Sequence, residues 1–448
     1  MKKTLRITVV LLLIVLVYLY FSFYPKLDIV TGFSAKSIAS HLFVAGRSQL
    51  QTEKEDNNIK SMELAKTKVD LKEKSVTSTA FGLKTRKAIY KDGLGAILLP
   101  HGKENTPLNL PKPKRNLTPI NKPFPYGNSP QKDTVFSNVD YQKLNKILTS
   151  SFDKNNERTN KTRAILIVYK DHIIAEKYKD GFDKNSILLG WSMTKSVTGT
   201  VLGILAKQGK VHLEQSHLFK EWENDERKNI TLKNLLNMNS GLAWNEDYSS
   251  ISDVTKMLFL AEDMPKVQLH KEMVGKPNES WNYSSGTTNL LSGFIKKQFK
   301  TEQDYLDFWY RELIDKIGMH SMVIEPDYSG NFVGSSYGWA TAIDWAKFGL
   351  LYLHNGNWDG EQIIDTTWVD FTKTPTNTSN GEYGGHFWLN AGGIYPDVPR
   401  DLFSCNGYQG QRVFILPSKD LVVVKFTVQE NTLKENNDLL KQVIQSIQ

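Results

Sequence analysis

The sequence has little cysteine and no clustered histidine, and each shortage excludes a class of site. Its one cysteine, Cys405, excludes an intrachain disulfide and a cysteine-rich metal site. The closest histidine pair, His212 and His217, lacks the i, i+4 spacing that places two ligands on one helix face. We find no internal repeat of solenoid length and no alternation of aromatic and basic residues typical of a nucleic-acid groove. The sequence predicts no metal, no cofactor and no nucleic-acid partner.

The composition is that of a globular protein with a basic surface. Hydrophobic residues make up 40% and charged residues 23% of 448 residues, enough for two or three domains with a large core. The formal net charge is +8, but much of the lysine is interleaved with Glu and Asp. This pattern favours a solvated basic face over a specific anionic partner.

The N-terminus predicts a membrane anchor. Lys2, Lys3 and Arg6 precede an uncharged, largely apolar run over residues 7–24, which is about the minimum length of a bilayer span. Aromatic residues close the run, and no small-residue cleavage site follows it. We therefore interpret residues 1–26 as a retained signal anchor in preference to a cleaved signal peptide. The basic end would stay in the cytoplasm, which places the rest of the chain outside, in a periplasm or at the cell surface.

The remaining chain divides into three predicted regions. Residues 27–98 form an N-terminal extension, with a helix over 35–44 and a β-like stretch over 75–98. Eight of the sixteen prolines lie between Pro100 and Pro130, which predicts an extended linker over 99–134. The third region is a large domain over 135–448.

The pattern of this third region predicts its fold class. A hairpin is expected over 164–178, helices dominate 192–351, a second hairpin spans 411–428, and a helix over 435–447 closes the chain. Strands at both ends with helices between them predict an α/β (α+β) protein. We expect an antiparallel sheet flanked by helices, together with a mostly helical domain.

A Ser-x-x-Lys motif provides a candidate nucleophile. Ser192 stands just ahead of an apolar-periodic stretch, at a predicted helix N-terminus, and Lys195 follows on the same helix face. A serine hydroxyl needs a base to accept its proton, and burial together with the helix dipole would favour a neutral lysine. The motif alone also fits an ordinary helix start, with Ser as N-cap and Lys in solvent.

A second serine motif competes with the first. Residues 334–338 read Gly-Ser-Ser-Tyr-Gly and satisfy the Gly-x-Ser-x-Gly pattern of α/β-hydrolases. That elbow requires a preceding strand, but residues 326–331 read as a polar turn, and only His386 follows as a plausible partner. We therefore interpret this motif as a glycine-serine loop.

Further segments resemble one family of enzymes in the expected order. Together with the Ser192 motif, they are similar to the β-lactamase-related serine hydrolases, which include class C β-lactamases, DD-peptidases, family VIII esterases and 6-aminohexanoate-dimer hydrolases. The similar segments cover residues 135–448: Leu-Leu-Asn-Met-Asn-Ser-Gly-Leu at 235–242, Trp-Asn-Tyr-Ser-Ser-Gly at 281–286, Ala-Thr-Ala-Ile-Asp-Trp-Ala-Lys-Phe-Gly-Leu-Leu at 340–351, and Gly-Tyr-Gln-Gly-Gln at 407–411. The extension at 35–47 and 81–98 resembles that of a 6-aminohexanoate-dimer-hydrolase-like subgroup. The resemblance implies a β-lactamase/transpeptidase-like fold.

The resemblance also assigns residues to roles. Ser192 would be acylated, Lys195 would accept or relay its proton, and Tyr283 would share the base work and protonate the leaving group. A Tyr283 phenolate would need Lys195 as a cation, so the two would titrate as a pair. The N–H groups of Ser192 and Gln411 would form the oxyanion hole.

Two departures from the family pattern bear on the substrate. Tyr408-Gln409-Gly410 stands where β-lactamases and DD-peptidases carry Lys-Thr/Ser-Gly, and Ser285 replaces the asparagine of Tyr-x-Asn. We predict Ser285, Tyr408 and Gly410 as substrate-binding residues. Arg412 could partly replace the lost cation, but strand alternation points it to the face opposite Gln411.

The predicted function is hydrolysis of a small ester or amide through an acyl-serine. The missing cation argues against β-lactam hydrolysis. Two alternatives stay open at this point: a catalytically inactive binding or sensor domain with the same fold, and a DD-peptidase or β-lactamase.

Overall fold

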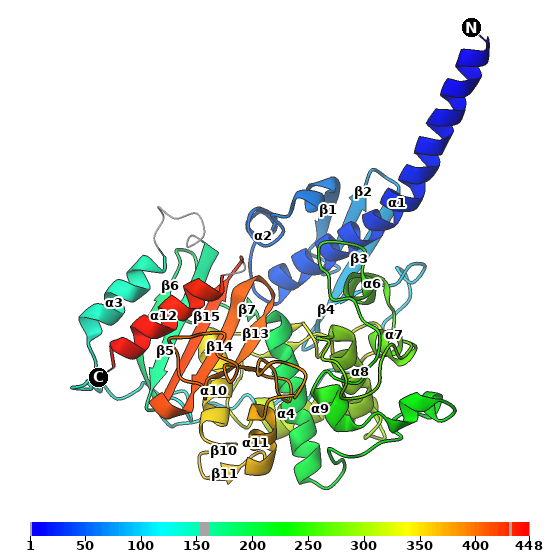
Figure 1. Cartoon of the computed structure of the whole chain (residues 1–448). Helices are drawn as coiled ribbons and strands as arrows, with labels where there is room; N and C mark the ends of the chain where they lie inside the picture. The colour runs from blue at the N-terminus through cyan, green and yellow to red at the C-terminus, as the bar shows by residue number, and fades with distance from the viewer. Residues whose placement is uncertain (1, 153–160, 430–431, 448) are drawn as a thin grey trace.

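The computed structural model describes residues 2–152, 161–429 and 432–447, and a six-stranded antiparallel sheet lies at its centre (Figure 1). The strand order is β12–β13–β14–β15–β5–β6. The strands are β5 (Thr162–Tyr169), β6 (His172–Tyr178), β12 (Trp388–Leu389), β13 (Phe403–Gly407), β14 (Gln411–Leu416) and β15 (Leu421–Thr427). Both predicted hairpins are present, and β15 pairs with β5 to join the two ends of the domain.

The side chains of β5 alternate between two cores, one on each face of the sheet. Leu166 and Val168 face the larger core, which holds the long helices, while Ile165 and Ile167 face the smaller one. Helix α10 (Ala342–Leu353) packs on the first face. Helices α3 (Tyr141–Ser150) and α12 (Leu433–Gln445) cover the second, as Figure 1 shows.

The region between the two hairpins is mostly helical, as the sequence predicts. Its helices begin at side-chain caps such as Thr231, Ser252 and Ser284, each of which accepts a hydrogen bond from the first turn. The elements are α4 (Thr194–Lys207), α5 (Leu232–Leu236), α6 (Asp253–Leu260), α7 (Met264–Leu269), α8 (Ser285–Lys296), α9 (Glu302–Trp309) and α11 (Thr366–Lys373), with a small sheet of β7 (Leu188–Leu189), β9 (Gly338–Ala340) and β8 (Val323–Ile324) and a hairpin of β10 (Asn357–Trp358) and β11 (Glu361–Gln362).

The N-terminal segment, residues 27–98, forms a helix-backed sheet. Its helix is the second half of α1 (Lys2–Phe43), which is much longer than the predicted 35–44. The four antiparallel strands are β1 (Ala65–Asp70), β2 (Ser75–Ala80), β3 (Lys84–Lys91) and β4 (Gly95–Leu98), preceded by α2 (Gln49–Lys54). The β-like stretch is confirmed, whereas β1 lies between the predicted helix and that stretch, where no strand is predicted.

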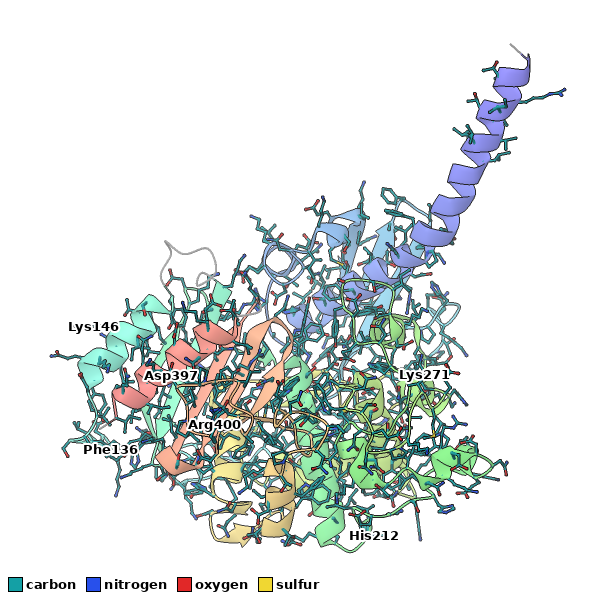
Figure 2. All side chains as sticks on the ribbon, viewed as in Figure 1. Phe136, Lys146, His212, Lys271, Asp397 and Arg400 are labelled. Atoms are coloured by element: carbon teal, nitrogen blue, oxygen red, sulfur yellow. The ribbon has the colours of Figure 1, made fainter. Side chains whose placement is uncertain are left out.

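The first half of α1 projects away from the body of the molecule (Figures 1 and 2). Its described apolar side chains are exposed, including Leu5 and residues 9–13. Much of the predicted anchor falls on residues 14–22, whose side chains lie outside the described set. Among the described residues, no helix combines the length and apolar character needed to cross a membrane. The anchor therefore stays a prediction.

A buried network of ion pairs joins the N-terminal segment to the six-stranded sheet. Asp56 lies 2.7 Å from Arg163 of β5 and 3.0 Å from His41 of α1. Arg163 also contacts Glu55 at 2.9 Å. The predicted linker, residues 99–134, contains no helix or strand, as the density of proline suggests.

Candidate active site

Ser192 lies in a short 3-10 turn, Trp191–Met193, directly before α4. Its side chain is nearly buried, with 9% of the residue surface exposed. Thr194 fixes this turn from both sides, because its hydroxyl donates to the Trp191 carbonyl at 2.7 Å and accepts from the N–H of Gly338 at 2.9 Å. The predicted helix start is confirmed, and the Ser192 hydroxyl lies at the N-terminal end of α4.

Lys195 lies one turn deeper and is 1% exposed. Its Nζ is 3.0 Å from Ser192 Oγ, 2.9 Å from Ser285 Oγ and 3.1 Å from the carbonyl of Ser335. Burial lowers the pKa of Lys195 to about 8, and the nearby charge of Glu246 opposes that shift. An appreciable fraction of this amine is therefore neutral near pH 8, so it can accept a proton from Ser192.

Tyr283 reaches the same place from a distant part of the chain. It stands one residue before Ser284, the N-cap of α8, so its side chain leaves the helix start toward α4. Lys195 Nζ is 4.7 Å from the centroid of the Tyr283 ring. Burial raises the pKa of the Tyr283 phenol, and a hydrogen bond with Ser192 partly offsets the rise. The phenol is thus held in its protonated form beside the hydroxyl.

Glu246 was missed by the sequence analysis, although its carboxylate is bonded to a predicted site residue. The Ser285 hydroxyl donates to Glu246 Oε1, and the Ser285 N–H donates to Oε2 at 2.9 Å. Trp244 Nε1 and the Tyr248 hydroxyl also donate to this carboxylate. Since Ser285 accepts from Lys195, a hydrogen-bonded chain runs from Glu246 through Ser285 to the lysine.

The competing Gly-x-Ser-x-Gly motif forms a buried turn before β9, as predicted. Ser335 contributes its backbone carbonyl to Lys195, while its hydroxyl contacts that of Ser336 at 2.8 Å. The His386 ring is bonded to the carbonyl of Leu236 and to Thr288, and neither of these partners belongs to the motif. This motif thus holds the lysine of the first motif.

The structure corrects the alignment of the closing strand. Residues 408–410 form a 3-10 turn between β13 and β14, and the strand end beside Ser192 is Asn406-Gly407. The approach is very close, since a Cβ added to Gly407 would lie 2.1 Å from the carbonyl oxygen of Gly190. Asn406 and Gly407 therefore form the strand end that lines the cavity with Ser192, and Tyr408 begins the turn that follows.

The predicted residues of this turn have different placements. The Gln411 side chain bonds the backbone of Thr427 and does not line the cavity, and neither does Gly410. Tyr408 does line it, with its ring stacked on that of Tyr248 at 4.9 Å. Arg412 also lines the cavity, on the face opposite Gln411 as strand alternation predicts.

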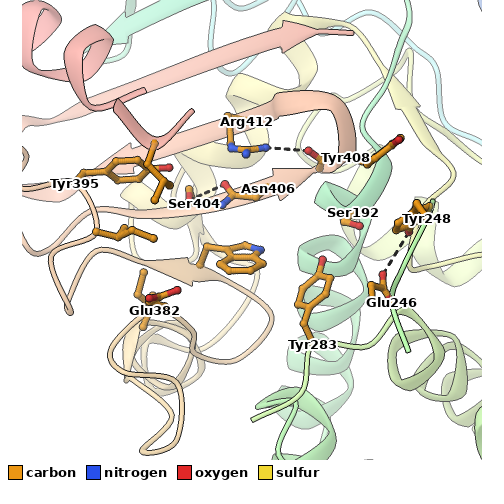
Figure 3. Close-up of a pocket in the computed structure, with 15 residues that line it drawn as sticks. Ser192, Glu246, Tyr248, Tyr283, Glu382, Tyr395, Ser404, Asn406, Tyr408 and Arg412 are labelled. Carbon is orange, nitrogen blue, oxygen red and sulfur yellow. Dashed lines mark hydrogen bonds between the residues drawn. The ribbon is translucent and has the colours of Figure 1, made fainter. Parts of the chain in front are cut away.

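A cavity of about 290 Å³ opens beside Ser192 (Figure 3). Aromatic side chains form much of its wall, and three charged side chains line it. In Figure 3, the Tyr283 hydroxyl points toward Ser192, Glu382 lies across from Ser404 and Asn406, and Arg412 donates to the Gly407 carbonyl at 2.9 Å. Its lining is Ser192, Glu246, Tyr248, Tyr283, Glu382, Trp388, Leu389, Ile394, Tyr395, Ser404, Asn406, Gly407, Tyr408, Arg412 and Leu433.

Known proteins are similar to this chain in sequence and in fold. A 6-aminohexanoate-dimer hydrolase from Paenarthrobacter ureafaciens is 22% identical over 303 residues, which is 59% of this chain and 72% of that protein. A candidate 6-aminohexanoate-dimer hydrolase from Bacillus anthracis superposes with a TM-score of 0.57 at 19% identity, covering 75% of this chain and 87% of that one.

A class C β-lactamase in complex with cefoxitin superposes with a TM-score of 0.53 at 12% identity, covering 69% of this chain and all of that one. The fold class expected from the sequence is confirmed by these likenesses. The sequence profile of the Beta-lactamase family matches residues 156–446, well over half of the chain. The chain therefore belongs to the β-lactamase family.

Proposed function

We propose that this chain is a serine hydrolase that cleaves an ester or amide through an acyl-serine on Ser192. The observation that carries the proposal is the 3.0 Å contact between Ser192 Oγ and a fully buried Lys195. A buried amine with a pKa near 8 can act as a base at neutral to mildly alkaline pH. The contacts of Tyr283 with both groups add a phenolic proton donor.

The contacts support a definite sequence of steps. Neutral Lys195 takes the proton of Ser192 as its oxygen attacks the substrate carbonyl carbon, which gives a tetrahedral oxyanion. The leaving alcohol or amine then takes a proton through the Tyr283 hydroxyl, and the lysine ammonium restores that proton. Water attacks the acyl-serine in the second half of the reaction, with the same groups moving protons in reverse order.

We infer that the backbone N–H groups of Ser192 and Tyr408 hold the oxyanion. Tyr408 directly follows Gly407, whose close approach to Gly190 fixes the end of β13 against the serine turn. Tyr408 lines the cavity beside Ser192, whereas Gln411 does not. A donor of this kind is worth about 100- to 1000-fold in rate.

The cavity favours a small substrate with an apolar part. Trp388, Leu389, Ile394 and Tyr395 form an apolar wall opposite the polar cluster around Ser192. Asn406, and not a lysine, stands at the end of β13, and the neighbouring cation, Arg412, is bonded to the Gly407 carbonyl at 2.9 Å. We therefore expect little turnover of a β-lactam such as nitrocefin.

Covalent labelling tests the proposal. The wild-type chain should react with a fluorophosphonate and hydrolyse p-nitrophenyl butyrate, and Ser192→Ala should do neither. Ser336→Ala is the matched control, because Ser336 is also buried and is the central serine of the competing motif. Labelling that persists in Ser192→Ala and is lost in Ser336→Ala would overturn the assignment.

A further inference from the structure

A buried ion pair joins helix α1 to the loop that follows β8. Lys36 Nζ lies 2.5 Å from Glu325 Oε2, and the Glu325 side chain is fully buried. Glu325 also accepts from Ser40 Oγ at 2.8 Å, from the Ala96 N–H at 2.6 Å and from Trp339 Nε1 at 2.9 Å. Three of its four partners therefore belong to the N-terminal segment.

The backbone of Glu325 closes the loop that holds the catalytic lysine. Its N–H donates to the Tyr337 carbonyl at 3.0 Å, and its own carbonyl accepts from Val333 at 3.0 Å. Between these two points lies Ser335, whose carbonyl accepts from Lys195 at 3.1 Å. Lys36 also sits 4.4 Å from the centroid of the Tyr337 ring. The ion pair thus fixes both ends of the stretch that delivers the Ser335 carbonyl.

The same helix covers the residue before the nucleophile. Trp191 has a left-handed backbone, with φ of 47°, although it is not glycine. Such a conformation costs free energy and persists only where the surroundings enforce it. The Trp191 side chain is buried in one cluster with Ile29 and Phe33 of α1, and its ring meets that of Tyr408 at 5.5 Å. Packing by α1 therefore helps to set the orientation of Ser192.

We propose that Lys36 and Glu325 are positioning residues for the acylation of Ser192, and that the N-terminal segment is part of the catalytic apparatus. The pair acts through the 333–337 backbone on Lys195, and α1 acts through Trp191 on Ser192. Neither Lys36 nor Glu325 lines the substrate cavity, so both act on the reacting groups and not on substrate binding. This inference rests on the proposed function.

Inactivation kinetics with a fluorophosphonate test the inference. In Lys36→Met we expect the maximal inactivation rate to fall about tenfold or more, because small displacements of reacting groups cost up to about 100-fold. The inhibitor constant should stay within about twofold, since the cavity is untouched. A purely structural role would lower the melting temperature and leave the inactivation rate of the folded fraction unchanged, which would overturn the inference.

Asp56→Asn is the matched control. Asp56 is similarly buried and also ties the N-terminal segment to the catalytic domain, but its partners are Arg163, His41 and Arg47, not the 325–337 loop. It should lower the melting temperature while leaving the inactivation rate within about twofold. An equal loss of rate in both variants would overturn the specific assignment to Lys36 and Glu325.

A double variant and the wild type decide the cases in which Lys36→Met does not fold or no labelling is seen. If Lys36→Met does not fold, Lys36→Met with Glu325→Gln removes both buried charges, and a wild-type rate there would overturn the inference. If the wild type itself is not labelled, the proposed function fails and the inference falls with it. A labelled wild type with unchanged variants overturns the inference alone.

Discussion

At the scale of single residues, burial favours one protonation state for each of the two groups beside Ser192, Lys195 and Tyr283. The same exclusion of water lowers the pKa of the Lys195 ammonium and raises that of the Tyr283 phenol, because each charged form loses its hydration. The two shifts favour the neutral form of both groups. Lysine as base and tyrosine as proton donor is therefore the arrangement that costs least, and no phenolate is needed.

The pH dependence of the reaction should follow Lys195. Below pH of about 8 the amine is mostly protonated and cannot accept the serine proton, so kcat/KM should rise with pH and level off above about 8. We call this rise of kcat/KM with pH the acidic limb of the profile. Lys195→Met should lower kcat/KM by about 100-fold or more and remove the acidic limb. A profile with p-nitrophenyl butyrate measures both effects. If the acidic limb survives in Lys195→Met, the group that titrates is not Lys195.

Glu246→Gln should move the same limb to lower pH. The Glu246 carboxylate stabilises the ammonium of Lys195, so removing its charge leaves burial unopposed and lowers the pKa of the lysine further. Glu382→Gln is the control, because Glu382 is the other carboxylate of the cavity and has no link to Lys195. In Glu382→Gln the acidic limb of the profile should stay near pH 8, even if the substitution changes KM. A shift toward higher pH in Glu246→Gln would contradict the assignment.

Spacing and order along the chain were enough to predict part of this cluster. Spacing predicts Ser192 and Lys195 on one helix face, whereas Tyr283 and Ser285 were predicted from the resemblance of residues 281–286 to a segment of the family. Glu246 lies in an irregular segment 39 residues before Ser285, so no period relates the two. Ser335 contributes a backbone carbonyl, which any residue type could supply.

At the scale of elements, the critical junction is the end of β13 against the serine turn. The sequence predicted β14 and β15 from their apolar runs but not β13, because Phe403–Gly407 is short and half polar. Two glycines, Gly407 and Gly410, both suit a close backbone approach, and composition alone does not distinguish them. The predicted closing strand was therefore placed a few residues too late.

Gly407→Ala should separate β13 from the nucleophile. The added methyl would lie 2.1 Å from the Gly190 carbonyl, so strand and turn must move apart. We expect kcat/KM to fall by about 100-fold while the far-ultraviolet circular dichroism is retained. Gly275→Ala is the control, because its added Cβ meets nothing nearer than 3.8 Å. Wild-type activity in Gly407→Ala would show that this approach is not needed.

His386 should make the packing of α5 and α8 sensitive to acid. Its Nδ1–H donates to the carbonyl of Leu236, the last residue of α5, and its Nε2 accepts from the Thr288 hydroxyl of α8. Burial lowers its pKa to about 3 from an ordinary 6.5. The unfolded chain therefore binds a proton that the folded chain does not, so stability is lost progressively as pH falls from 6.5 toward 3.

His386→Asn should reduce the slope of the unfolding free energy against pH by the equivalent of about one proton taken up on unfolding. Asparagine is chosen because it tolerates the left-handed backbone at this position. Thermal melts between pH 4 and 7 measure the slope. His212→Asn, at an exposed histidine labelled in Figure 2, should leave the slope unchanged. Equal slopes in the wild type and His386→Asn would place the acid sensitivity elsewhere.

At the scale of the whole molecule, local patterns predicted the layers but not how the N-terminal segment joins them. Periodicity and turn residues indicate each strand and helix separately. The buried contacts of Lys36 with Glu325 and of Asp56 with Arg163 span 289 and 107 residues. Because a lysine-rich stretch read alone is indistinguishable from a solvated one, residues 27–98 were predicted as an extension without any of these buried partners.

Two truncations distinguish an appendage from an integral part. Removing residues 2–22 should leave folding and labelling intact, because the described side chains at 4–13 are exposed and burial begins at Leu27. Removing residues 1–98 would uncover Trp191 and leave Glu325 and Arg163 buried without these partners. Breaking one such pair costs about 3–5 kcal/mol, against a total stability of about 5–15 kcal/mol. We therefore expect the shorter chain to be insoluble or unlabelled, as measured by soluble yield, thermal melting and fluorophosphonate reaction. A soluble 99–448 chain that is labelled at the wild-type rate would show that the catalytic domain is complete without the N-terminal segment.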